Sequence, residues 1–123
     1  RENSILLARS PHFPKGRYSA LAGFVDIGET AEEATYREVH EEVNLTVHNL
    51  EYFGTQSWPF LPSSFMIAFT AEYLSGQIKI DPKEIEDAKW FDINNLPELP
   101  TRGSISWQLI TQTVTSMQED KAY

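Results

Sequence analysis

Residues 23–45 read GFVDIGETAEEATYREVHEEVNL, and this stretch predicts a glycine-containing loop that leads into a helix. Thr30 is followed three residues later by Glu33, which is the pattern of a capping box at a helix N-terminus. We therefore expect the helix to begin near Ala31 and to run to about Val43. The rest of the fold has to accommodate this loop and helix.

The predicted helix carries Glu38, Glu41 and Glu42 on one face. Side chains separated by three or four residues project to the same side, because each residue turns the helix by roughly 100°. Like charges at this spacing weaken a helix by about 0.2–0.5 kcal/mol per pair, so a divalent cation is expected to neutralise them. The alternative is an ordinary solvated acidic helix. The acids border a stripe expected to be buried, which consists of Thr35, Tyr36, Val39 and Val43.

The spacing between the glycine loop and the acids resembles the signature of the Nudix hydrolases. The matching positions are Gly23, Glu29, Arg37, Glu38, Glu41 and Glu42. Asn44 departs from the signature, because that family usually has glycine after the helix. Asparagine is the residue that best replaces glycine in a left-handed C-terminal turn, so we expect the turn to be kept. The resemblance implies an ion pair between Arg37 and Glu29 that pins the loop to the helix; the alternative is that Arg37 is a surface cation.

The resemblance also implies metal-dependent hydrolysis of a pyrophosphate. This reaction needs cations that neutralise developing charge and hold an attacking water. Glu38, Glu41 and Glu42 are oxygen ligands of the kind that suits Mg²⁺ or Mn²⁺. Similarity to the family adds the backbone carbonyl of Ala22 and the side chain of Glu84 as ligands. The implied catalytic group is Arg37, Glu38, Glu41 and Glu42. The general base stays open among Glu41, Glu42 and Glu84.

A second motif, at residues 55–66, resembles a signature of the NADH pyrophosphatases within that family. The retained residues are Gln56, Trp58, Pro59, Phe60, Pro62, Ser64 and Met66. Thr55 and Ser57 depart from the signature, and Leu61 is an additional residue. The substrate-binding residues implied by the resemblance are Phe24, Gln56, Trp58, Phe60, Ser64 and Ser106. The alternative to a substrate-binding role for Trp58 and Phe60 is that they only cover one end of the core. The alternative for Ser106 is that it only begins a helix.

The composition of the 123-residue chain fits one small domain over residues 1–123, with 41% hydrophobic and 12% aromatic residues. The net charge of −8 disfavours general nucleic-acid binding, for which a basic surface is usual. The absence of cysteine excludes disulfides and cysteine-ligated zinc within this chain. No apolar run approaches the roughly 20 residues of a membrane span. We therefore expect a cytoplasmic protein that does not bind membranes.

Hydrophobic periodicity along the chain predicts an α/β fold. Strands are expected at 4–9, 18–22, 46–58, 64–74 and 88–92, and a second helix at 105–117. Strands before and after one central helix suggest a mixed β-sheet sandwiched between helices, which agrees with the α/β/α Nudix fold that the resemblance implies. Because the first strand has almost no lead-in, we expect a fragment of a longer chain.

These features predict metal-dependent hydrolysis of NADH or a similar NAD-like dinucleotide to two mononucleotides, NMN(H) and AMP. A general Nudix hydrolase of ADP-ribose or nucleoside triphosphates is the alternative, because Ser57 and Leu61 disturb the substrate signature. A catalytically silent nucleotide-binding module is the alternative of another class, and the complete set of acids argues against it. The resemblance implies a homodimer and, in full-length relatives, an upstream cysteine zinc module. NAD-capped RNA stays open as a substrate.

Overall fold

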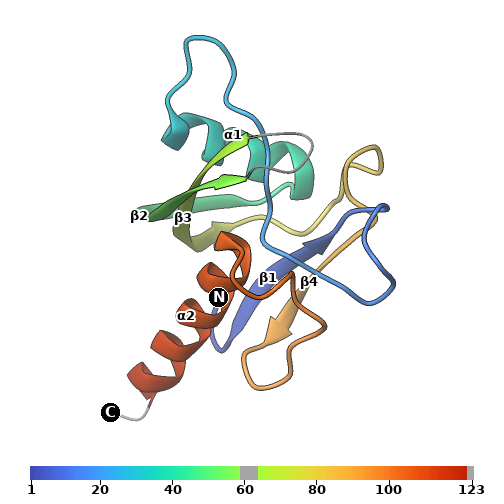
Figure 1. Ribbon diagram of the computed structural model, residues 1–123, viewed down its shortest axis with the longest axis vertical. Helices are drawn as coiled ribbons and strands as arrows, with labels where there is room; N and C mark the ends of the chain where they lie inside the picture. The colour runs from blue at the N-terminus through green and yellow to red at the C-terminus, as the bar shows by residue number, and fades with distance from the viewer. Residues whose placement is uncertain (59–63, 122–123) are drawn as a thin grey trace.

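The computed structural model describes residues 1–58 and 64–121 (Figure 1). These residues form two helices and four strands, and the strands make two antiparallel pairs. The elements are β1 (Ser4–Arg9), α1 (Ala31–Val43), β2 (Thr46–Trp58), β3 (Ser64–Ser75), β4 (Asp87–Asp92) and α2 (Ile105–Lys121). The α/β class is confirmed, and the predicted bounds of β1, α1 and β2 hold. Strand β3 ends one residue later than predicted, β4 begins one residue earlier, and α2 extends to Lys121. Neither helix, as far as the chain is described, is long and apolar enough to cross a lipid bilayer.

The predicted strand at 18–22 is wrong as a continuous element. Strand β1 pairs with β4, and β2 pairs with β3. The segment ahead of Gly23 contributes only single bridges, an antiparallel one from Ser19 to Ala8 and a parallel one from Arg17 to Glu98. The ladder stops there because the next amide, that of Ala20, donates to the Ser106 hydroxyl instead of to a neighbouring strand. Parallel pairing in the described residues is therefore limited to one bridge.

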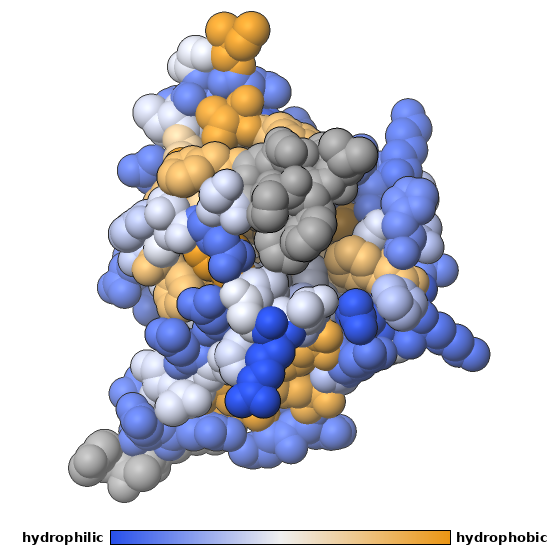
Figure 2. Space-filling view, in the orientation of Figure 1, coloured by the Kyte–Doolittle hydropathy of each residue, from blue (hydrophilic) through white to orange (hydrophobic). Residues whose placement is uncertain are grey.

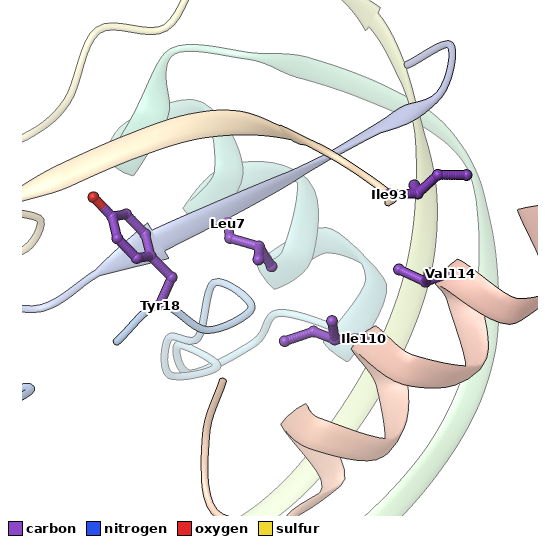
Figure 3. Close-up of a cluster of buried hydrophobic side chains, with 5 residues drawn as sticks. All are labelled: Leu7, Tyr18, Ile93, Ile110 and Val114. Atoms are coloured by element: carbon purple, nitrogen blue, oxygen red, sulfur yellow. The ribbon is translucent and has the colours of Figure 1, made fainter. Parts of the chain in front are cut away.

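Strand β1 is buried on both faces, which places it between the two helices. One face contributes to the cluster of Leu7, Tyr18, Ile93, Ile110 and Val114, in which Leu7 lies opposite the α2 side chains (Figure 3). The other face contributes to the cluster of Ala8, Val43, Leu45, Ile85 and Ala88, in which Val43 is the last residue of α1. Because successive strand residues point to opposite faces, the helices cover opposite sides of β1. The predicted helix–sheet–helix sandwich is confirmed.

Helix α1 has the predicted caps at both ends. Thr30 and Glu33 form the capping box, with backbone-to-side-chain hydrogen bonds of 2.9 and 3.0 Å. Asn44 closes the helix in the left-handed conformation with a φ of 64°, and its amide donates to the His40 carbonyl. The buried side of the helix differs from the predicted stripe, because Tyr36 is 41% exposed whereas Glu42 is only 5% exposed.

The segment that follows β3 covers the C-terminal end of α1 and explains this difference. The Lys79 amide donates to the Val43 carbonyl at 3.0 Å, and the Asp81 amide donates to the Glu42 carbonyl at 2.9 Å. At the start of the segment, a side chain on Gly76 would come within 2.7 Å of the Asn44 carbonyl oxygen, so only glycine fits. Because this segment lies over the end of α1, Glu42 on the acidic side of the helix is buried. Glu84, which belongs to the same segment, lies near Glu42.

The left-handed turn at Asn44 gives a test of this end of the fold. Replacing Asn44 with alanine is expected to lower the free energy of unfolding by about 1–2 kcal/mol, because a Cβ strains that conformation. Replacement with glycine should leave it close to wild type. Urea unfolding of both variants checks this, with Asn95→Ala as the control, because Asn95 is exposed and lies outside the left-handed region. Equal losses in Asn44→Ala and Asn44→Gly would contradict the account.

Candidate active site

The guanidinium of Arg37 joins the glycine loop to helix α1. It forms a two-pronged pair with Glu29, with Nε at 2.8 Å and Nη2 at 2.9 Å from the two carboxylate oxygens. Its Nη1 donates to Glu38 at 2.8 Å and to Glu41 at 3.0 Å. Its Nη2 also donates to the backbone carbonyl of Phe24 at 3.0 Å. The predicted ion pair with Glu29 is present, and Arg37 is more than a surface cation.

Glu29 extends this network back into the loop. Its carboxylate accepts a hydrogen bond from the Asp26 amide at 3.0 Å, and its own amide donates to the Asp26 carbonyl at 3.1 Å. Hydrogen bonds from Arg37 and from the Asp26 amide lower the pKa of Glu29 to about 2. Glu29 therefore stays ionised at neutral pH and keeps the loop closed on Arg37.

The loop backbone lies directly against the Glu38 side chain. A Cβ on Gly23 would stand only 2.4 Å from the Glu38 carboxyl carbon and 2.5 Å from one of its oxygens. No L-residue with a side chain fits there without displacing Glu38. The glycine of the signature is thus needed because the backbone at Ala22 and Gly23 approaches the carboxylate so closely. This approach fits the predicted pairing of the Ala22 carbonyl with Glu38 as metal ligands.

Glu42 is a buried carboxyl group that forms no ion pair with a basic side chain in the described part of the chain. It is 5% exposed, and its Oε2 atom is buried with no hydrogen-bond partner among the described residues. Burial, a hydrogen bond with Glu38 and the nearby negative charges of Glu38, Glu84 and Asp81 together raise the pKa of Glu42 to about 8. An acid kept in such a place, next to other acids, is suited to bind a cation.

The structure brings the predicted metal ligands together only in part. Glu42, Glu38 and Glu84 influence one another electrostatically, whereas Glu41 is half exposed and faces Arg37. In the parts of the chain that the structure describes, no three acidic or histidine side chains converge as a finished metal cage. The reason is that Arg37 draws both Glu38 and Glu41 toward itself. The unpaired Glu42 oxygen and the all-oxygen donor set still fit Mg²⁺ or Mn²⁺.

A cleft of about 230 Å³ is lined by residues other than this cluster of acids. Its lining consists of Phe13, Arg17, Ser19, Gln56, Met66, Pro100, Thr101, Ser104, Ile105 and Ser106. Two predicted substrate residues, Gln56 and Ser106, are therefore brought together. Both also have structural contacts: the Gln56 carbonyl oxygen accepts from the Ile105 amide at 2.8 Å, and the Ser106 hydroxyl accepts from the Ala20 amide at 3.3 Å.

The remaining predicted substrate residues lie apart from the cleft lining or outside the described structure. The Phe24 side chain is 71% exposed and belongs, with Val25 and Ile27, to an exposed apolar tip. Figure 2 shows apolar side chains at the top, where this loop projects above α1. Trp58 and Ser64 are paired at the ends of β2 and β3, but their side chains, like the whole of Phe60, fall outside the described residues.

Sequence reasoning missed Arg17 as a lining residue of the cleft. Its contacts with Glu98, through the backbone bridge and through an ion pair of 3.1 Å, join positions far apart in the chain. A loop arginine between Gly16 and a short extended segment carries no local signal for such a contact. Only the topology reveals it.

Comparison with known proteins gives consistent matches. The profile of the NUDIX domain family matches residues 1–112. A protein named NAD-capped RNA hydrolase NudC from Chromobacterium violaceum is 53% identical over 122 residues, which are 99% of this chain and 46% of that protein. The protein of the same name from Vibrio cholerae is 47% identical over 122 residues, which are 99% of this chain and 45% of that protein. The chain thus spans about half the length of these curated relatives.

Solved structures support the same fold. A MutT NUDIX hydrolase from Burkholderia pseudomallei superposes with a TM-score of 0.72 at 22% identity, covering 91% of this chain and 89% of that one. A UDP-X diphosphatase superposes with a TM-score of 0.68 at 23% identity, covering 94% of this chain and 58% of that one. At such low identity these similarities establish the fold alone.

The buried Glu42 predicts a pH dependence of stability in the metal-free protein. Its pKa is raised from 4.5 to about 8, so the folded state holds its proton more tightly than the unfolded state. The free energy of unfolding should therefore fall as pH rises between these values. Glu42→Gln should remove this fall, because an amide does not ionise. Urea unfolding across this range with a chelator present checks the prediction.

The control for this measurement is Glu32→Gln, which changes an exposed glutamate in the first turn of the same helix. Its stability should follow the wild-type pH dependence. Parallel curves for wild type and Glu42→Gln would show that Glu42 ionises normally in the folded state, and the account of its burial would be wrong.

Proposed function

This chain belongs to the NUDIX domain family, and we propose that it hydrolyses the pyrophosphate bond of NADH or a closely related NAD-like dinucleotide to NMN(H) and AMP. The observation that carries the proposal is the buried carboxyl of Glu42, which lies beside Glu38 and whose Oε2 atom has no hydrogen-bond partner among the described residues. The NudC relatives support the substrate class, because they are named as hydrolases of NAD-capped RNA.

The acid cluster and the cleft lie within reach of one extended ligand. Ser19 lines the cleft, and Gly23 lies against the Glu38 carboxylate. Even a fully extended chain advances only about 3.3–3.6 Å per residue, so the path from residue 19 to residue 23 spans no more than about 14 Å. A dinucleotide can therefore place its pyrophosphate beside the acids while one base enters the cleft.

Chemistry at the pyrophosphate requires a divalent cation. Mg²⁺ or Mn²⁺, held by Glu38, Glu42, the Ala22 carbonyl and Glu84, would neutralise developing charge and lower the pKa of an attacking water. The chain's own residues prepare this site. Arg37 and Glu29 fix the loop so that the Ala22–Gly23 backbone stays next to Glu38. Glu41 faces Arg37 in this arrangement, and the general base is to be sought among Glu41, Glu42 and Glu84.

The cleft suits the base of a dinucleotide. Phe13, Met66, Pro100 and Ile105 give it apolar walls, and hydroxyl groups and the Gln56 amide supply a few polar contacts. The exposed Phe24 ring at the loop tip offers a stacking surface for a base. These features favour a substrate with two bases over a small pyrophosphate.

General hydrolysis of ADP-ribose or nucleoside triphosphates is the second candidate. Thr55, Ser57 and Leu61 depart from the motif that resembles the NADH pyrophosphatases, whereas the acids of the family signature are all present. This combination favours a general pyrophosphate hydrolase over one that is specific for NADH. NAD-capped RNA is a further candidate substrate, because it carries the same dinucleotide. Homodimer formation, implied by the resemblance, stays part of the proposal.

A substrate panel with one variant pair tests the proposal. In Mg²⁺ or Mn²⁺, wild type is expected to convert NADH to NMNH and AMP with a higher kcat/KM than ADP-ribose or ATP. Glu42→Gln should lower turnover by orders of magnitude, because a neutral amide binds a divalent ion poorly. Chromatography of the products gives both rates. NAD-capped RNA is included as a further substrate.

The matched control is Glu32→Gln, which removes one exposed charge from the same helix and should retain wild-type activity. Turnover of Glu42→Gln near the wild-type rate would exclude Glu42 from the site. A preference for ATP or ADP-ribose over NADH would replace the proposed substrate with the second candidate.

A further inference from the structure

Asp81 begins the turn that carries Glu84, and it also joins this turn to Glu42. The Asp81 amide donates to the Glu42 carbonyl at 2.9 Å. The Asp81 carbonyl accepts from the Glu84 amide at 3.1 Å and from the Ile85 amide at 2.9 Å. The side chain belongs to the same turn, because its Oδ1 atom accepts from the Lys83 amide at 3.1 Å. One residue therefore links two acids of the proposed metal site.

The local sequence explains why the chain turns here. Residues 81–84 read DPKE, with aspartate at the first position of the turn and proline at the second. Proline presets the φ of the second position, and an aspartate at the first position accepts from the amide two residues later. The hydrogen bond from the Lys83 amide is this contact. Glu84 stands at the fourth position, so closure of the turn fixes its backbone.

Apolar contacts on both sides hold the turn against the end of α1. Ile85 is buried in the cluster that contains Val43, the last residue of α1, and Ile80 packs against the same cluster. Glu84 itself is exposed, as is Lys83 before it. The direction of the Glu84 side chain therefore depends on the turn backbone, which the contacts of Asp81 close.

We infer that Asp81 is a positioning residue, which holds Glu84 beside Glu42 through the turn that its main chain and its carboxylate close. This inference rests on the proposed function, in which Glu42 and Glu84 hold the divalent cation. Removal of a group that orients a metal ligand typically lowers metal affinity by about 10- to 100-fold. Asp81 acts through Glu84 and is not itself a ligand of the cation.

Two substitutions of Asp81 separate its part in the turn from its charge. Asp81→Asn removes the charge and keeps the turn, because asparagine accepts from the amide two residues later as aspartate does. Asp81→Glu keeps the charge and loses the turn contact, because glutamate is not among the side chains that form it. Calorimetric titration of Mn²⁺ into each metal-free variant gives its affinity for the cation.

The two variants should differ in their affinity for Mn²⁺. We expect Asp81→Glu to bind about 10- to 100-fold more weakly than wild type, because Glu84 loses its fixed position. Asp81→Asn should stay within about fivefold of wild type, because a partly exposed charge outside the ligand set contributes little. In the metal-free protein, hydrogen exchange at the Lys83 and Glu84 amides should be faster in Asp81→Glu than in Asp81→Asn. This second measurement reports on the turn without cation or substrate.

The matched control is a turn of the same construction at the end of β4. Asp92 accepts from the Asn94 amide through Oδ1 at 2.8 Å and from the Asn95 amide through its carbonyl at 2.9 Å. Asp92→Asn and Asp92→Glu should both bind Mn²⁺ as wild type does, because no acid of the proposed site belongs to this turn. An equal loss of affinity in Asp92→Glu and Asp81→Glu would show a general effect on folding and would overturn the inference.

The pattern of losses at Asp81 decides between position and charge. Equal losses in Asp81→Asn and Asp81→Glu, a loss confined to Asp81→Asn, or unchanged affinity in both would each overturn the inference. If Asp81→Glu does not fold, Asp81→Ala takes its place, because it also lacks the turn contact. Asp81→Ala should then bind Mn²⁺ about 10-fold or more weakly than Asp81→Asn, which lacks the charge alone.

Failure of the underlying function gives a different result. A wild-type protein that does not bind Mn²⁺ refutes the metal site of the proposed function, and the inference about Asp81 falls with it. Wild-type affinity in Glu84→Gln would remove Glu84 from the ligand set and overturn the inference, while a site built on Glu42 would stand. Loss of affinity in Glu84→Gln alongside an unaffected Asp81→Glu refutes the inference alone.

Discussion

The site depends on the position of the Arg37 guanidinium. One planar cation contacts the loop through Glu29 and the Phe24 carbonyl and contacts the helix through Glu38 and Glu41. Because the fork is rigid and two-pronged, it fixes direction as well as distance. The loop backbone consequently lies so close to Glu38 that only glycine fits at position 23. Without this contact, the carbonyls of the loop and the acids of the helix would have no fixed relation.

A second constraint comes from the segment after β3. Its amides satisfy the last carbonyls of α1, and by doing so it covers Glu42. Burial of an unpaired carboxyl is costly in itself, so a fold that keeps one has a use for it elsewhere. The use that we propose is binding of a divalent cation, which would offset the repulsion between Glu42 and the neighbouring carboxyl groups of Glu38 and Glu84. Under this proposal, the metal-free state is less stable because Glu42 is buried among other acids, and a bound cation would relieve that cost.

Local signals explain which parts of this arrangement could be predicted from the sequence. The boundaries of α1 are set by Thr30 and Asn44, which act through contacts with residues three or four positions away. The exposure of Tyr36 and the burial of Glu42 could not be read locally, because a helical wheel shows which residues share a face but not what covers it. The cover comes from around residue 80. The strand expected at 18–22 failed for a similar reason, since the Ala20 amide is taken by Ser106 from the other end of the chain.

The central claim is that the acids around Glu42 form a divalent metal site. Calorimetric titration of Mn²⁺ into the metal-free protein near neutral pH, repeated in buffers of different ionisation enthalpy, tests it directly. Because the pKa of Glu42 is raised to about 8, binding should release about one proton, and Glu42→Gln should lose both the tight binding and the release. Tight binding without proton release, or equal binding by Glu42→Gln, would contradict the account.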